Sequence, residues 1–132
     1  MQILNSNFNF SFDKGNFYFS RVAEGIEPFI ISETCRFFEN KNILVILKNN
    51  QQILSYSKII NKNLKNFNIL LFPSWDCSPY DTTSPDQMLI SKRFKAIRSF
   101  FQNRQSNNLI ITSLKSLLLK IPPIQETIIN TT

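Results

Sequence analysis

Two carboxylates and two aromatic side chains lie close together in the middle of the chain, where Trp75-Asp76 is followed by Tyr80-Asp81. Paired carboxylates can serve acid–base chemistry or hold a metal ion. The chain contains no histidine, which excludes His-based triads and imidazole general bases. Asp and Asn side chains often bond to nearby backbone in turns. We therefore interpret Asp76 and Asp81 as turn-capping residues and expect neither a catalytic residue nor a metal site.

Cys35 and Cys77 stand far apart, and neither has a second thiol near it in the sequence. This spacing excludes CxxC redox chemistry and a zinc site, and two lone cysteines fit a reducing compartment. The start, MQILNSNFNF, lacks the basic and long apolar parts of a secretory signal. No apolar run approaches the length of a membrane span. We expect a cytoplasmic protein with no membrane partner.

The carboxylates belong to a proline-rich connector between a predicted strand, Phe67–Leu71, and a predicted helix. Ser84 fits the N-cap of that helix, Pro85 the first helical position, and Gln87 the third position of a capping box. Beyond it an apolar face is predicted, whereas Lys92, Lys95 and Arg98 lie largely off that face. The predicted apolar face consists of Ile90, Phe94, Ile97 and Phe101.

Three aliphatic runs, separated by helical patterns, predict an α/β fold with a mainly parallel sheet. The run Ile43–Leu47 is continuous, as in a strand that is buried on both faces. The third predicted strand is Asn108–Thr112. Helices are predicted within 23–40, after Asn49 or Asn50, and from Ser113 to Leu119, before Pro122-Pro123.

In a nucleotide-binding fold of this class, a phosphate loop precedes the first helix. The sequence at that place in this chain departs from the phosphate-loop motif. The loop requires G-x-x-x-x-G-K-[ST], so that backbone N–H groups and a lysine contact the phosphates. Counted from Gly25, the second glycine is replaced by Ile30 and the lysine by Ile31, and Glu24 and Glu27 add negative charge. We expect no nucleotide cofactor to bind near Gly25.

The connector and helix together carry a family resemblance. The residues Leu71-Phe72-Pro73-Ser74-Trp75-Asp76, Pro79-Tyr80-Asp81, Ser84-Pro85 and Ser91-Lys92-Arg93-Phe94 resemble the amino-terminal module of bacterial transcription-repair coupling factors (Mfd). That module is itself similar to the first domain of the excision-repair protein UvrB. Phe94 replaces the usual leucine. The resemblance extends more weakly over 23–123.

The resemblance implies a partial P-loop-NTPase-like three-layer sandwich with a degenerate phosphate loop. It divides the chain into a Phe-rich extension (1–22), the amino-terminal part of a UvrB-like first subdomain (23–123) and the truncated start of the next subdomain (124–132). The residues implied as structural or interdomain contacts are Pro73, Trp75, Asp76, Pro79, Tyr80, Asp81, Ser84, Pro85, Ser91 and Arg93. For Arg93 we expect an internal salt bridge. The UvrB hairpin that clamps DNA has no room between Tyr80 and Ser84.

In full-length family members, ATP and Mg serve a motor domain, and the partners are UvrA, RNA polymerase and double-stranded DNA. The resemblance therefore implies a non-catalytic module in transcription-coupled nucleotide excision repair, which contacts the remainder of the coupling factor. Two alternatives stay open: a divergent helicase-like NTPase half-domain and a stand-alone basic DNA-binding domain.

The net charge of +6 permits contact with nucleic acid or an acidic partner, although lysine enrichment by biased composition explains it as well. Lys92, Lys95 and Arg98 are the candidate contacts with DNA or an acidic surface, and simple solvation of this face is favoured. Trp75 and Tyr80 are either a contact surface or a cover for the end of the sheet, and the second is favoured. Phenylalanines at alternate positions between Asn7 and Ser20 predict a β-hairpin or an extension packed on the domain. Because a sheet with one flank missing leaves apolar surface uncovered, we expect exposed apolar residues and a fragment of a longer protein.

Overall fold

A parallel three-stranded sheet forms the centre of the computed structural model, which describes residues 15–16, 18–76, 86–103 and 107–121. The strands are β1 (Ile43–Leu47), β2 (Asn68–Phe72) and β3 (Asn108–Ser113), and their order in the sheet is β1-β3-β2. Ile43 pairs with Leu109, and Asn68 with Asn108, so that all three strands begin at the same edge. The predicted α/β class with a parallel sheet is confirmed.

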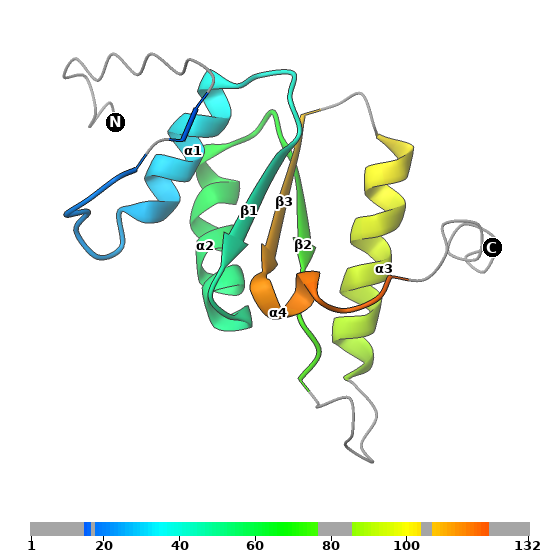
Figure 1. Cartoon of the computed structure of the whole chain (residues 1–132). Helices are drawn as coiled ribbons and strands as arrows, with labels where there is room; N and C mark the ends of the chain where they lie inside the picture. Colours follow the sequence, from blue (N-terminus) through cyan, green and yellow to red (C-terminus); the bar gives the residue numbers. More distant parts are fainter. Residues whose placement is uncertain (1–14, 17, 77–85, 104–106, 122–132) are drawn as a thin grey trace.

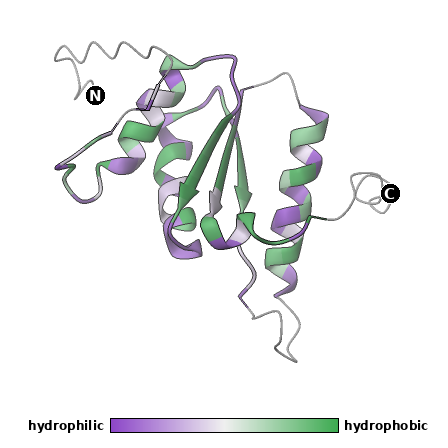
Figure 2. Cartoon of the chain, in the orientation of Figure 1, coloured by the Kyte–Doolittle hydropathy of each residue, from purple (hydrophilic) through white to green (hydrophobic). Residues whose placement is uncertain are grey.

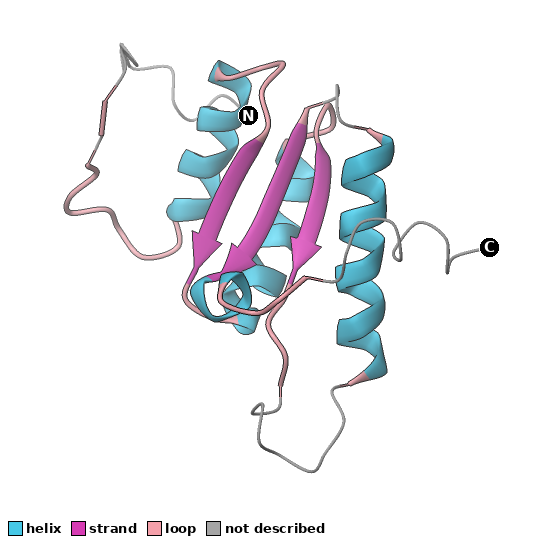
Figure 3. Ribbon diagram, turned by 45° about the vertical axis from the view of Figure 1, so that its right-hand side comes forward, coloured by secondary structure: helices cyan, strands magenta, loops and turns pink. Residues whose placement is uncertain are grey.

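Helices cover the two faces of the sheet unequally. The helices α1 (Glu27–Phe37) and α2 (Asn50–Asn63) lie on one face, and α3 (Gln87–Gln102) stands beside β2 on the other (Figures 1 and 3). The short α4 (Leu114–Leu117) follows β3 directly. Within the described ranges, no helix is both long and apolar enough to cross a bilayer.

The larger core lies between the sheet and α1 and α2. Cys35, Ile53, Ile60, Leu109 and Ile111 are almost fully buried there. Figure 2, coloured by residue hydropathy, shows hydrophobic residues along the strands and both hydrophobic and hydrophilic residues along each helix. The smaller core, on the α3 side, contains Leu70, Phe72 and Ala96. Burial of these side chains supplies most of the driving force that holds the layers together.

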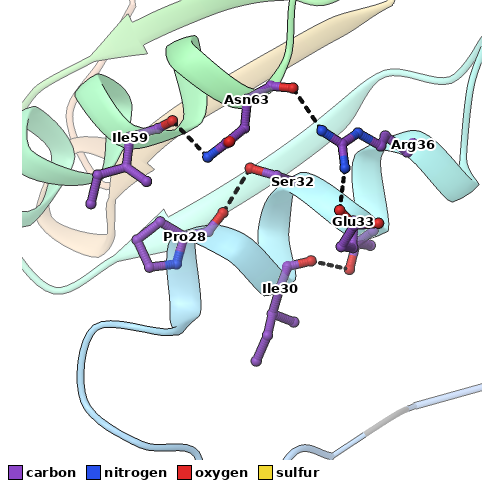
Figure 4. Close-up of polar contacts among 8 residues, drawn as sticks. Pro28, Ile30, Ser32, Glu33, Arg36, Ile59 and Asn63 are labelled. Carbon is purple, nitrogen blue, oxygen red and sulfur yellow. Dashed lines mark hydrogen bonds and ion pairs between the residues drawn. The ribbon is translucent and has the colours of Figure 1, made fainter. Parts of the chain in front are cut away.

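Polar contacts fix α1 against α2, as Figure 4 shows. Arg36 donates to the carbonyl of Asn63 at 2.8 Å and forms an ion pair with Glu33. The hydroxyl of Ser32, which is buried in α1, donates to the carbonyl of Pro28 at 2.8 Å. That bond satisfies a polar atom that would otherwise be costly to bury.

A set of asparagines holds the strands together at their amino ends. Asn108 is fully buried, and its side-chain oxygen accepts a hydrogen bond from Asn68 at 2.9 Å. Its amide nitrogen donates to Asn42 Oδ1 at 2.9 Å and to the carbonyl of Asn103 at 2.9 Å. The sequence places Asn108 at the start of a predicted strand but does not indicate these side-chain contacts, which the parallel register brings about.

Further expectations concern β1, at the edge of the sheet, and the Phe-rich stretch 7–20. The prediction that Ile43–Leu47 is buried on both faces is wrong, because Leu44 is 52% exposed and Ile46 51% exposed. The strand lies at an edge of the sheet, and no described helix covers that face of it. The separate prediction of exposed apolar surface on this sheet is thereby confirmed. Of the Phe-rich stretch 7–20, the described residues 15, 16 and 18–20 form no strand, and the remainder lies outside the described residues.

Candidate functional site

At the amino end of α1, where a phosphate loop would lie, backbone N–H groups bond to the chain's own carboxylate and carbonyl oxygens. Gly25 has a φ of +88°, and its N–H donates to the carboxylate of Glu27 at 2.9 Å. Pro28 has no N–H, and the amides of Phe29 and Ile30 both bond to the carbonyl of Ile26. Phosphate binding at a helix start depends on free N–H groups and on the positive end of the dipole. Here a carboxylate already takes that position.

Negative charge is concentrated at this helix start. Burial, followed by the nearby charge of Glu27 and then Glu24, raises the pKa of Tyr56 on the neighbouring α2. A triphosphate placed here would meet the same carboxylates. Glu24 and Glu27 therefore make the local potential at this helix start more negative.

The connector after β2 is held to α2 by one asparagine. Asn50 Oδ1 accepts from the backbone N–H of Ser74 at 2.9 Å and from its hydroxyl at 3.1 Å, and Asn50 Nδ2 donates to the Ser74 carbonyl at 2.9 Å. Asn49, one residue earlier, is the N-cap of α2 and accepts from the N–H of Gln52. Sequence reasoning treated Asn49 and Asn50 as equivalent capping candidates and missed the role of Asn50.

Three of the family-motif residues meet around one buried guanidinium. Arg93, on α3, is only 4% exposed, and its Nη1 donates to the carbonyl of Pro73 at 2.7 Å and to Ser116 Oγ at 2.5 Å. Its guanidinium carbon lies 4.0 Å from the centre of the Phe72 ring and 4.7 Å from that of Trp75. Burial lowers the pKa of Arg93. Cation–π contact and charge-assisted hydrogen bonds compensate for the lost hydration.

The described partners of Arg93 are neutral oxygens and aromatic rings. The internal salt bridge expected for Arg93 stays a prediction, because residues 77–85 of the connector lie outside the described residues. The remaining basic residues, Lys92, Lys95 and Arg98, lie on more exposed parts of the helix. An arginine that is flanked by two other cations in the sequence gives no sign of which one turns inward.

Asp76 and Asp86 join the two ends of the connector. The backbone N–H of Asp86 donates to Asp76 Oδ1 at 3.3 Å, and Asp86 itself caps α3 by accepting from the N–H of Met88 at 2.9 Å. The predicted N-cap, Ser84, is therefore wrong by two residues, since Asp86 occupies that position. The bond to Asp76 agrees with its interpretation as a turn-capping residue.

The rest of the motif is divided between described and undescribed positions. Pro73 is buried, Trp75 is half-buried, and Ser91 is exposed on α3. The residues Cys77, Pro79, Tyr80, Asp81, Ser84 and Pro85 lie outside the described residues. Of the two carboxylates Asp76 and Asp81, the structure thus describes Asp76 alone.

An apolar groove of about 580 Å³ opens between the sheet and α3. Leu44 and Ile110 form its floor, Ile97 and Phe101 of α3 line one side, and Leu117 and Ile121 close the end next to α4. A smaller cavity of about 30 Å³ between Trp75 and Lys120 is too small for a ligand. Within the part of the chain that the structure describes, no three acidic, cysteine or histidine side chains gather as metal ligands.

Known proteins resemble this chain over a limited stretch. No protein-family model matches it. The transcription-repair-coupling factor of Rickettsia typhi is 36% identical over 84 residues, which are 64% of this chain and 7% of that protein. The corresponding factor of Rickettsia conorii is 44% identical over 59 residues, 44% of this chain and 5% of that protein. That of Haemophilus influenzae is 28% identical over 105 residues, 79% of this chain and 9% of that protein.

The matched stretch therefore spans less than a tenth of the length of these curated relatives. Three of the motif residues that the structure describes also meet in space, since Arg93 contacts both Pro73 and Trp75. The resemblance drawn from the sequence is confirmed: this chain is similar to a short segment of the transcription-repair-coupling factors.

Proposed function

We propose that this chain serves transcription-coupled nucleotide excision repair as a non-catalytic structural module of a coupling factor. Its fold would be the degenerate, NTPase-like part of a UvrB-like first subdomain. The observation that carries the proposal is the bond from Gly25 N–H to the Glu27 carboxylate at 2.9 Å, in the place where a nucleotide phosphate would be held.

The chemistry of that position supports a loss of nucleotide binding. A phosphate loop offers several free N–H groups and one lysine to the phosphates. Here one amide is taken by a carboxylate, one position is a proline, and Ile31 stands in place of the lysine. Restoring the site would require changes at several positions together.

The same proposal distinguishes the partner of this chain's own surface from the partners of the full-length protein. The open apolar groove beside β1 suits packing against the remainder of the coupling factor. UvrA, RNA polymerase and double-stranded DNA would be engaged through the full-length protein, where ATP and Mg serve a separate motor domain. What this chain supplies is a platform whose connector is fixed by Arg93 and Asn50.

A titration with Mg-ATP tests the absence of a nucleotide site. A ligand at a hundred times its Kd stabilises the folded state by about 2.7 kcal/mol, which appears as a rise in Tm of several degrees. We expect no saturable rise for the wild-type chain up to millimolar Mg-ATP, and none for the variant Glu27→Gln, which removes the carboxylate charge. Saturable stabilisation that is lost on changing Gly25 would instead establish the NTPase alternative.

A second candidate function, contact with DNA, rests on charge distribution. The segment 87–121 contains no acidic residue, and its basic residues are Lys92, Arg93, Lys95, Arg98, Arg104, Lys115 and Lys120. Binding to phosphates would show a linear fall of log K with log salt concentration. Replacing Lys92 and Lys95 by glutamine would then reduce the slope by about one for each lost contact. Replacement of Lys58 and Lys62 on α2 by glutamine is the matched control.

A further inference from the structure

The cavity between Trp75 and Lys120 differs from the apolar groove because two cationic side chains line it. Its walls are Trp75, Arg93, Phe94, Ile97 and Lys120. At about 30 Å³ it is too small for a whole small-molecule ligand, but a single water molecule needs only about 10–15 Å³. The cavity therefore has room for one functional group with about two oxygen atoms.

Arg93 brings a buried positive charge to this cavity. Its side chain is only 4% exposed, and both of its hydrogen bonds to described residues come from Nη1, to the carbonyl of Pro73 and to Ser116 Oγ. Among the described residues, no fully buried side-chain nitrogen or oxygen lacks a partner. The Nε and Nη2 donors of Arg93, which bond to no described residue, therefore keep access to the space that this side chain lines.

No described acidic residue balances that charge. The ion pair of Arg36 with Glu33 is the only one among the described residues, so none of the described carboxylates forms an ion pair with Arg93. Lys120, exposed at the rim of the cavity, adds a second cation, and the segment 87–121 contains no acidic residue. A buried charge without a counter-ion is costly, and aromatic contacts offset only part of that cost.

The free edge of the guanidinium has the geometry that a carboxylate requires. Nε and Nη2 lie on one side of the planar group, and two parallel N–H donors match the two oxygens of a carboxylate. Because Nη1 makes the bonds to Pro73 and Ser116, this edge is the one that stays available. The fixed position of Nη1 also orients the edge before any ligand arrives.

The size and lining of the cavity favour a carboxylate side chain over a DNA phosphate. Phe94 is 39% exposed and Lys120 is exposed, so an entering side chain can reach the space between them. The apolar walls, Trp75, Phe94 and Ile97, suit the methylene groups that precede the carboxylate of Glu or Asp. A phosphodiester is larger, and the stiff duplex that carries it does not enter a recess of about 30 Å³.

We propose that this cavity is a subsite for one carboxylate side chain, glutamate or aspartate, of a partner protein. The carboxylate accepts hydrogen bonds from Nε and Nη2 of Arg93, and the ammonium group of Lys120 attracts it at the rim. This recognition role goes beyond the platform proposed above and does not depend on it.

A titration with sodium acetate tests the subsite. The Nε–H resonance of Arg93 is followed in the nitrogen-15-labelled chain, in parallel series with acetate and with sulfate at matched ionic strength. We expect a saturable shift with acetate and an apparent Kd on the order of 10–100 mM, because one small anion makes few contacts. Sulfate carries more charge but is larger, and should give no saturable shift. The absence of a shift with acetate, or an equal shift with sulfate, would overturn the proposal.

A matched pair of lysine variants separates the subsite from general surface charge. Lys120→Gln removes the cation at the rim and should weaken acetate binding at least threefold. Lys115→Gln, on α4, is the control, because Lys115 does not line the cavity, and it should leave the Kd unchanged. The fluorescence of Trp75, the only tryptophan, supplies a second readout of the same binding. Equal weakening by both variants would refute the subsite.

Two larger probes identify the source of the carboxylate. Hexaglutamate should shift the Arg93 resonance and compete with acetate, whereas a short DNA duplex of equal total charge should not. A shift with the duplex that Lys120→Gln abolishes would make the site a phosphate contact and refute the protein partner. The variant Asp81→Asn examines the chain's own connector. Acetate binding that appears only in this variant would show that Asp81 already supplies the carboxylate, and would also overturn the proposal.

Discussion

At the scale of single residues, Arg93 is the one whose use differs most from its appearance in the sequence. It stands in a basic cluster and would ordinarily be solvated, yet it is buried between Phe72 and Trp75. The motif drew attention to the position, but a sequence shows charge and spacing and does not show which rings stack on a guanidinium. The planar shape of the group, as much as its charge, is what this packing requires.

Shortening Arg93 should therefore cost far more than shortening a neighbouring cation. Arg93→Ala removes two charge-assisted hydrogen bonds and leaves the carbonyl of Pro73 without that donor, so we expect a loss of about 2–4 kcal/mol in the free energy of unfolding. Arg93→Lys should recover less than half of it, because an ammonium does not stack as a guanidinium does. Urea denaturation followed by Trp75 fluorescence measures both. Lys95→Ala, on the exposed side of α3, should stay within about 0.5 kcal/mol of wild type. Equal losses at both positions would contradict the assignment.

Cys35 makes a pH-dependent contribution. Burial raises the pKa of its thiol from 9.0 to about 11. Above pH 9 the unfolded chain loses this proton and the folded chain keeps it, so the folded state binds more protons and its stability falls as pH rises. Between about pH 9 and 11 the loss attributable to Cys35 should approach 2–3 kcal/mol.

Chemical denaturation at pH 8, 9.5 and 10.5 measures this slope. The variant Cys35→Ala should be less stable at pH 8, because it leaves a cavity, and should show a shallower fall at high pH. Identical slopes for the variant and the wild-type chain would show that the thiol stays accessible to base.

At the scale of elements, the strands were easier to predict than the first residue and the buried face of helix α3. The aliphatic run Ile43–Leu47 matches β1 at both ends, because such runs are diagnostic of strands in a parallel sheet. The start of α3 was placed wrongly because Ser84 and Asp86 are both good capping residues, and local pattern alone does not choose between them. The predicted apolar face of α3 overlaps the observed one only in part: Ile97 packs against the smaller core and Phe101 lines the groove, whereas Phe94 is 39% exposed and the buried positions are Arg93 and Ala96.

The junction of β2 with α2 depends on a residue that no periodicity reveals. Asn50→Ala would leave the N–H and hydroxyl of buried Ser74 without their acceptor, and we expect a loss of about 2–3 kcal/mol. Gln51→Ala, at the next and exposed position of α2, should change stability by less than about 0.5 kcal/mol. Thermal unfolding followed by circular dichroism compares the two. A small effect of Asn50→Ala would mean that water replaces the lost acceptor.

At the scale of the whole molecule, the sequence predicted uncovered apolar surface but neither the strand order nor the strand on which that surface lies. Continuous aliphatic runs identify three strands but do not tell an edge strand from a central one, so β1 was expected to be buried on both sides. The central strand is β3, the last of the described strands, because the connection through α2 passes over it to β2. That order leaves Leu44 and Ile46 exposed.

The two faces of β1 should respond differently to substitution. Leu44 is 52% exposed on the face that no described helix covers, so Leu44→Thr should change the free energy of unfolding by less than about 0.5 kcal/mol. Val45 packs against the core under α2, and Val45→Ala should cost about 1–2 kcal/mol because it removes methyl groups from that core. Urea titrations of the two variants measure both values. Equal losses at the two positions would show that Leu44 is as well covered as Val45 and that the groove is filled in the folded chain.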